Sequence, residues 1–166
     1  MSLRGLHMNT KPYTDEELAA LRSMPKRITN PGARWSEKPK GRPSHRQRNF
    51  QASGGQDDEG RFSVYQRQNL NDESDFSCGI SYLPPSGPSL TLARYNSPSH
   101  PHQGISYRPH IHRASERAIA AGKKPESEAE ETGRFETLEG ALTCLMEDFN
   151  LTGFTPKPDH QIRMSL

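Results

Sequence analysis

The stretch that decides the fold of this chain is FSCGISY, residues 76–82. Its larger side chains, Phe76, Cys78, Ile80 and Tyr82, alternate strictly with serine and glycine. Successive side chains of a β-strand point to opposite faces of a sheet, so this alternation predicts a half-buried strand. One face of the sheet is therefore expected to be core, and the other is expected to face water.

The flanking residues extend this strand into a sheet. A turn rich in proline and glycine at residues 84–88 leads into a second apolar segment at residues 90–96, and the two segments predict a hairpin. Two earlier segments, residues 45–53 and 61–70, have weaker apolar patterns, and we expect one strand in each. The sequence thus predicts about four antiparallel strands.

The clearest helix lies near the C-terminus, where Thr137 is a favourable N-cap. The apolar residues that follow it share one helical face: Leu138, Ala141, Leu142, Leu145, Met146 and Phe149. Such a helix can cover the apolar face of a sheet. The predicted fold class is therefore α+β, an antiparallel sheet of about four strands covered by a C-terminal amphipathic helix.

The chain divides by composition into three parts. Residues 1–44 are expected to hold a short helix, which begins at the Thr14–Glu17 capping box and ends before Pro25, followed by a basic, proline-containing and partly flexible arm. Residues 45–152 form the single α+β domain, and residues 153–166 form a flexible tail.

Composition narrows the class of protein. Hydrophobic residues make up 30% of the chain and the mean hydropathy is -0.96, with no segment typical of a secretory signal or a membrane span. We therefore expect a soluble, cytoplasmic protein without a membrane partner. Cys78 and Cys144 fall in apolar patterns, so we expect both thiols to be free and buried in a reducing compartment.

Charge is distributed unevenly. Between residues 22 and 48 there are nine basic residues and the single acid Glu37, and between residues 126 and 150 there are eight acids and only Arg134. The basic arm can bind phosphates through counterion release, or it can lie against the acidic half of the same molecule. In the first case the candidate nucleic-acid-binding residues are Arg42, Arg46, Arg48 and Arg108.

The only chemically suggestive stretch runs from Arg94 to Arg113. It holds four of the seven histidines within thirteen residues: His100, His102, His110 and His112. In an extended chain His110 and His112 point to the same side. Arg94 and Asn96 are expected to share a face with Leu90 and Leu92 on the preceding strand.

A short helix over residues 113–121 would bring Glu116 within one turn of His112. A carboxylate in that position would fix the imidazole tautomer and raise its basicity. Metal-free phosphodiester cleavage needs such an imidazole as acid or base and an arginine to stabilise the developing charge. The candidate catalytic residues are His110, His112, Arg94, Arg113 and Glu116.

Two other interpretations of the histidines stay open. Two histidines with Glu116 could form an open metal site, but no known ligand motif is present, so we predict neither a metal nor another cofactor. The histidines could also be hydrogen-bonded structural residues in a proline-rich region. Whether the chain is an enzyme therefore stays undecided at this point.

Three runs carry a resemblance to a known family: residues 76–80, residues 90–96, and His110-Ile111-His112-Arg113-Ala114. Together they resemble a family of small uncharacterised bacterial proteins over roughly residues 45 to 150. The histidine portion is similar to that of small toxins of toxin-antitoxin modules, which implies an RNA-linked role. Two functions follow. The first is a nucleic-acid-associated, toxin-like and RNA-directed protein with RNA or DNA as partner, and the second is a noncatalytic protein-interaction module with structural histidines.

Overall fold

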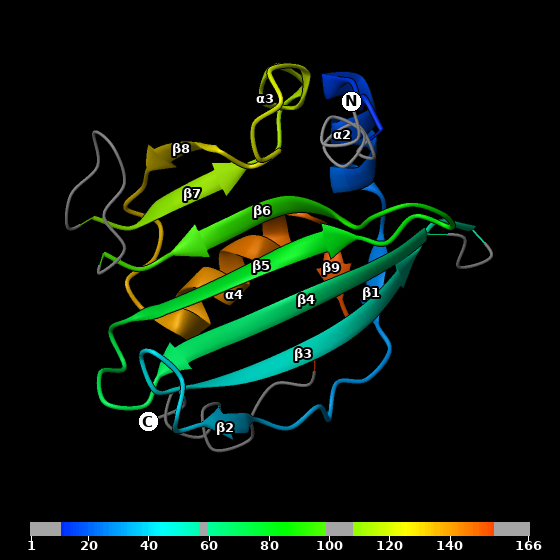
Figure 1. Ribbon diagram of the computed structural model, residues 1–166. Coiled ribbons are helices and arrows are strands. Elements are labelled where there is room, and N and C mark those ends of the chain that lie inside the picture. The colour runs from blue at the N-terminus through cyan, green and yellow to red at the C-terminus, as the bar shows by residue number, and fades with distance from the viewer. Residues whose placement is uncertain (1–10, 57–59, 99–107, 155–166) are drawn as a thin grey trace.

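The computed structural model describes residues 11–56, 60–98 and 108–154. Its centre is a nine-stranded sheet in the order β8-β7-β6-β5-β4-β3-β1-β9, with β2 also paired to β3 (Figure 1). All pairings are antiparallel except that of β1 with β9. The strands are β1 Lys26–Ile28, β2 Ser36–Lys38, β3 His45–Gly54, β4 Gly60–Asn69, β5 Phe76–Tyr82, β6 Leu90–Asn96, β7 His110–Arg113, β8 Glu128–Glu131 and β9 Leu151–Thr152, and the helices are α2 Asp15–Ser23, α3 Glu116–Ala120 and α4 Leu138–Asp148.

The predicted fold class, a sheet of about four strands covered by a C-terminal helix, is wrong. The four predicted strands correspond to β3, β4, β5 and β6, and the sheet continues beyond them on both sides. The additional strands are two to four residues long, which is too short to show an alternating pattern. The result is a large mixed sheet with three short helices in the described part of the chain.

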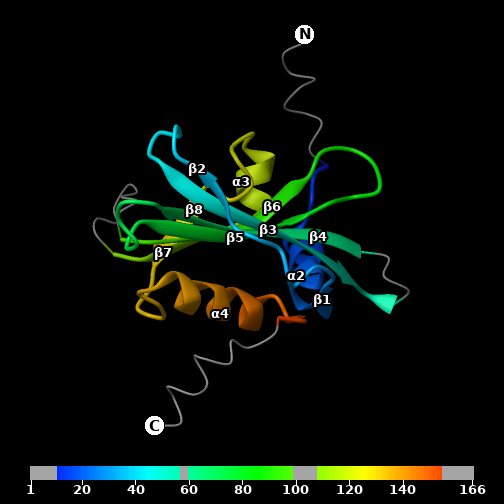
Figure 2. The same cartoon turned by 90° about the horizontal axis from the view of Figure 1, so that it is seen from below.

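The core lies between this sheet and α4. Helix α4 begins at Thr137, whose hydroxyl accepts a hydrogen bond from the amide of Gly140, and it runs along one face of the sheet (Figure 2). Apolar side chains of the central strands pack beneath it, and the largest that are fully buried include Phe50, Phe62, Ile80, Tyr95, Leu138 and Leu145. Burial of these side chains is the main favourable contribution to folding.

Helix α2 is joined to the end of α4 by Lys26. The predicted capping box is confirmed, because Thr14 and Glu17 exchange side-chain to backbone hydrogen bonds. Lys26 follows α2 and is only 2% exposed. Its ammonium donates to the carbonyl oxygens of Arg22, Met24 and Phe149 at 3.0, 2.8 and 2.7 Å. One buried cation thereby satisfies carbonyl groups at the ends of both helices.

The basic arm that follows α2 supplies two strands to the same sheet. Strand β1 pairs with the last residues of β3, and β2 pairs with its first residues, so both lie along one edge of β3. Trp35, just before β2, packs with its ring 4.0 Å from the guanidinium carbon of Arg46. The indole thus anchors this segment, as is usual for a large side chain that is costly to expose.

Strand β6 contains an irregularity that changes the faces of its residues. Leu90 lies opposite Tyr82 and Ala93 lies opposite Ile80, although the two β6 residues are three positions apart. The extra residue interrupts the alternation, as in a β-bulge. Arg94 therefore lies on the face opposite to that of Leu90, and the expectation that Leu90 shares its face is wrong.

Both cysteines are free and buried, as predicted. Burial raises the pKa of the Cys78 thiol well above its ordinary value, so this sulfur stays protonated. In the described ranges, no helix combines the length and the apolar character that a bilayer crossing requires.

Candidate nucleic-acid interface

The face of the sheet opposite α4 carries polar side chains on its central strands. Figure 2 shows α4 below the sheet, whereas α3, the loop after β2 and the loop between β5 and β6 rise above it. These segments border the face but do not cover its centre. Two rows of side chains, perpendicular to the strands, make up that centre.

The first row crosses five strands through residues that lie directly opposite each other. Its members are Gln47, Arg67, Ser77, Asn96 and His110. Neighbouring strands lie about 4.8 Å apart, so the row spans about 19 Å. Every member carries a hydrogen-bonding group, and one carries a permanent positive charge.

The second row lies two residues further along the strands. It consists of Asn49, Tyr65, Gly79, Arg94 and His112. This row adds a second guanidinium and the phenol ring of Tyr65. Burial raises the pKa of Tyr65, which keeps its phenol a neutral hydrogen-bond donor.

A depression of about 480 Å³ lies over the two rows. Its walls are formed entirely by side chains of β3, β4, β5 and β6: Gln47, Asn49, Ser63, Tyr65, Arg67, Ser77, Arg94 and Asn96. All of these side chains have polar groups. The depression therefore suits a polar, extended ligand better than an apolar small molecule.

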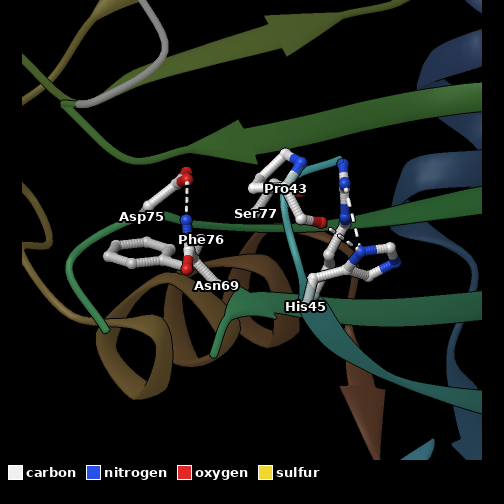
Figure 3. A pocket seen from close by; sticks show the side chains of 7 residues that line it. Pro43, His45, Asn69, Asp75, Phe76 and Ser77 are labelled. Atoms are coloured by element: carbon white, nitrogen blue, oxygen red, sulfur yellow. Dashed lines mark hydrogen bonds between the residues drawn. The ribbon is translucent and has the colours of Figure 1, made fainter. Parts of the chain in front are cut away.

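A smaller cavity of about 40 Å³ adjoins this depression through Arg67 and Ser77, which line both. Figure 3 shows this cavity, in which His45 Nδ1 donates a hydrogen bond to the carbonyl oxygen of Pro43 at 3.0 Å. Arg67 Nη2 lies 3.5 Å from the same ring nitrogen. The loop before β3 therefore comes close to Arg67 of the first row.

Gly79 allows two residues of the second row to meet. A Cβ atom at this position would lie 2.9 Å from Tyr65 Cε1, 3.3 Å from Arg94 Cγ and 2.7 Å from the carbonyl oxygen of Ala93. The first and last of these distances are too short for any side chain. The Tyr65 ring and the Arg94 stem thus lean over Gly79 from both sides.

His110 and His112 lie side by side at the end of the two rows. Both rings are on the same side of β7, as predicted, with centroids 5.2 Å apart, and they are only 1% and 4% exposed. Each Nδ1 donates to a backbone carbonyl oxygen, that of Arg108 at 3.2 Å and that of Glu126 at 3.0 Å. These bonds fix the orientation of both rings.

Arg94 and Glu126 form an ion pair beside His112. Arg94 Nε lies 3.2 Å from Glu126 Oε2, and the Glu126 side chain is 9% exposed, whereas that of Arg94 is 32% exposed. This contact is an ion pair without a hydrogen bond, since Arg94 Nε has no hydrogen-bond partner among the described residues. The Arg94 side chain is thus paired with Glu126, but about a third of it is exposed and it lines the depression.

Two predicted catalytic residues lie elsewhere. Arg113 is opposite Ala93 on the α4 side of the sheet and pairs with Glu130. Strand alternation places it there, since it directly follows His112. Glu116 begins α3, where its carboxylate accepts a hydrogen bond from the amide of Asp15 at 2.9 Å. The predicted His112–Glu116 pair is therefore wrong, because His112 lies in β7 and the helix begins only at Glu116, so the two residues are not one helical turn apart.

The predicted nucleic-acid-binding arginines are dispersed. Arg42 is exposed in the loop between β2 and β3, and Arg108 is exposed next to Glu131, 3.9 Å away. Arg46 and Arg48 lie on the α4 side, on the same face of β3 as Phe50. None of the four lines the depression. The other two clustered histidines, His100 and His102, lie outside the described residues.

Several residues of the interface were missed from the sequence. Gln47, Asn49, Ser63, Tyr65 and Arg67 all occupy alternate positions of β3 and β4. Their signal was the polar half of the same alternation that predicted the core strands. This signal does not distinguish a binding surface, because polar residues at alternate positions of a strand are usually solvated surface.

Within residues 11–56, 60–98 and 108–154, no group of three or more histidine, cysteine, aspartate or glutamate side chains is placed to hold a metal ion. Comparisons of the chain with protein-family models, with curated proteins and with solved structures gave no match. The resemblance to a bacterial family and to small toxins therefore stays a prediction.

Proposed function

We propose that this chain binds single-stranded RNA across the polar face of its sheet. The observation that carries the proposal is the pair of cross-strand rows, which present two guanidinium groups, one phenol and several carboxamides along an open depression. Proteins that bind single strands combine positive charge along the backbone with an aromatic side chain on which a base stacks.

Each kind of side chain has a role in this proposal. Arg67 and Arg94 contact phosphates, and Tyr65 stacks on a base or a ribose. Gln47, Asn49 and Asn96 offer paired donors and acceptors to the edges of unpaired bases. Two phosphate contacts to a single strand predict a slope of about -1.4 in a plot of the logarithm of the association constant against the logarithm of the salt concentration.

The test is fluorescence anisotropy of a labelled twelve-nucleotide RNA at 25 to 200 mM KCl. Arg67→Gln and Tyr65→Leu are each expected to weaken binding by about tenfold, since a charged hydrogen bond or a stacked base contributes roughly 1 to 3 kcal/mol. Arg34→Gln is the matched control, because it removes one charge from an exposed loop residue outside the depression. Absence of binding at 25 mM KCl, or equal affinity of all four proteins, would refute the proposal.

We propose that His110 and His112 hold β7 in place and do not cleave RNA. Their burial, and the carbonyl group that each Nδ1 contacts, favour this structural role, which also suits a noncatalytic interaction module. Gel analysis of the labelled RNA after prolonged incubation tests it. Cleavage that is lost in His110→Asn or His112→Asn, with binding retained, would assign them to catalysis instead.

We further propose that the chain acts in the cytoplasm. The two free, buried thiols support a reducing compartment. Fractionation of the cells that express the chain, with detection by an antibody, tests this location.

A further inference from the structure

A second cluster of arginines lies on the opposite side of the sheet from the polar face. Arg46 and Arg48 are two residues apart on β3 and therefore share a face. Each lies directly opposite a glutamine of β4, Gln68 and Gln66 respectively. This cluster rests on different residues from the RNA-binding proposal and is independent of it.

Both guanidinium groups are held in fixed positions. Arg46 donates from Nε and Nη2 to Gln68 Oε1 at 3.2 and 2.6 Å, and Arg48 donates from the same two atoms to Gln66 Oε1 at 3.0 and 2.6 Å. Gln66 and Gln68 are only 2% and 9% exposed, so they are rigid acceptors. The Nη1 groups of both arginines have no hydrogen bond to the described part of the chain.

Trp35 contacts both arginines. The centre of its ring lies 4.0 Å from the guanidinium carbon of Arg46 and 4.5 Å from that of Arg48. Such cation–π contacts orient the planes of the two groups and limit their motion. Trp35 is also the single tryptophan of the chain, so its fluorescence reports on this cluster alone.

The charge of this cluster is not balanced by a neighbouring acid. No carboxylate of the described residues lies within 4.0 Å of either guanidinium. Burial, followed by the charge of Arg46, lowers the pKa of Arg48, and the charge of Glu139 acts in the other direction. Two half-buried like charges without a counter-ion are unfavourable unless an anion joins them.

We infer that Arg46 and Arg48, together with Trp35, bind a phosphate group. A tetrahedral phosphate has enough oxygen atoms to accept hydrogen bonds from both Nη1 groups at once, and arginine forks match its geometry. The phosphate is either the free ion or the terminal phosphate of an oligonucleotide, since both present the same oxygen atoms.

The test is a titration of tryptophan fluorescence with inorganic phosphate at constant ionic strength, with chloride as the balancing anion. We expect a saturable change in emission. Its apparent affinity should fall at least tenfold in Arg46→Gln and in Arg48→Gln and stay unchanged in Arg34→Gln and in Arg67→Gln. A 5′-phosphorylated trinucleotide and the same trinucleotide without the phosphate distinguish the two sources of the ligand.

The glutamine variants are checked for folding by circular dichroism. If either is unfolded, Arg46→Lys and Arg48→Lys replace them, because lysine keeps the charge but loses the forked donors and should also weaken binding. A titration in which chloride gives the same change as phosphate, or in which the folded variants bind phosphate as tightly as the parent, would overturn the inference. Loss of RNA binding in Arg67→Gln alone would leave it intact.

Discussion

Replacement of Lys26 by methionine should destabilise the protein by an amount that depends on pH. Methionine keeps the aliphatic stem over Phe62 and Phe149, whose rings the ammonium now faces at 4.9 and 5.6 Å, but it removes three hydrogen bonds to backbone carbonyls. Bonds to a charged group contribute about 1.5 to 3 kcal/mol each.

Burial of the charge opposes this gain. It lowers the pKa of Lys26 from 10.5 to about 8, which corresponds to a cost of about 3 kcal/mol for the charged form at pH 7. Two of the three carbonyl groups are only part-buried, so the lower figure per bond applies to them. The net destabilisation of Lys26→Met at pH 7 should therefore be about 1.5 to 3 kcal/mol.

The pH dependence follows from the same pKa. Between pH 8 and pH 10.5 the unfolded chain binds more protons at Lys26 than the folded chain does, so the stability of the parent protein rises with pH in this window. From pH 7 to pH 9.5 the contribution of Lys26 should increase by about 2 kcal/mol. The difference between parent and variant should grow by the same amount, because all other groups titrate alike in both.

The assay is urea unfolding at pH 7 and pH 9.5, followed by circular dichroism. Arg27→Met is the control, because Arg27 is the exposed neighbour of Lys26 on the same strand, and its replacement should change stability by less than about 0.5 kcal/mol. A variant as stable as the parent at pH 7 would show that the three carbonyl bonds only match the cost of burying the charge, which contradicts the expected net stabilisation. A difference that stays constant with pH would show that these bonds fully offset the burial of the charge.

Three further perturbations test the fold. Gly79→Ala forces a Cβ to within 2.7 Å of the Ala93 carbonyl oxygen, so it should lower the unfolding free energy by about 1 to 3 kcal/mol and weaken RNA binding; unchanged urea unfolding would contradict the close approach. Thr137→Ala removes the N-cap of α4 and should cost about 1 kcal/mol by the same method, whereas Thr137→Ser should be neutral. Burial raises the pKa of Asp148, but hydrogen bonds, first that from Arg134, outweigh burial and leave the pKa lowered. The stability that Asp148 contributes should therefore be present above about pH 4 and be lost as the pH falls further. An Asp148→Asn variant whose melting temperature falls in parallel with that of the parent below about pH 4 would contradict this prediction.

The central strands were predictable because their alternation is long. The predicted segments 76–82 and 90–96 match the bounds of β5 and β6. The first shows a period of two over seven residues, and the second is an apolar segment that follows a turn rich in proline and glycine. Strands β1 and β9 were not predictable, because three and two residues show no period and their partners lie far away in the chain. Their formation depends on tertiary pairing.

The candidate site was predictable only within one strand. Alternation placed His110 and His112 on one side, and the same rule could have placed Arg113 on the other. The contribution of Tyr65 and Arg67 depends on which strands are neighbours, and that follows from the sheet order and not from local sequence. The bulge in β6 likewise has no local signal, since nothing in residues 90–96 indicates that the alternation breaks there.

The parallel pairing of β1 with β9 has a consequence for synthesis and folding. Lys26 lies beside Leu151, so this contact joins residues at nearly opposite ends of the described chain. Contacts between residues so distant in sequence form late, because the entropy of closing the intervening loop must be overcome first. A nascent chain that has not yet reached Leu151 cannot make this contact. The hydrogen bond from Lys26 to the carbonyl oxygen of Phe149 likewise requires that Phe149, two residues earlier, has been synthesised. The last turn of α4 and the first strand therefore become native together, after Leu151 has been synthesised.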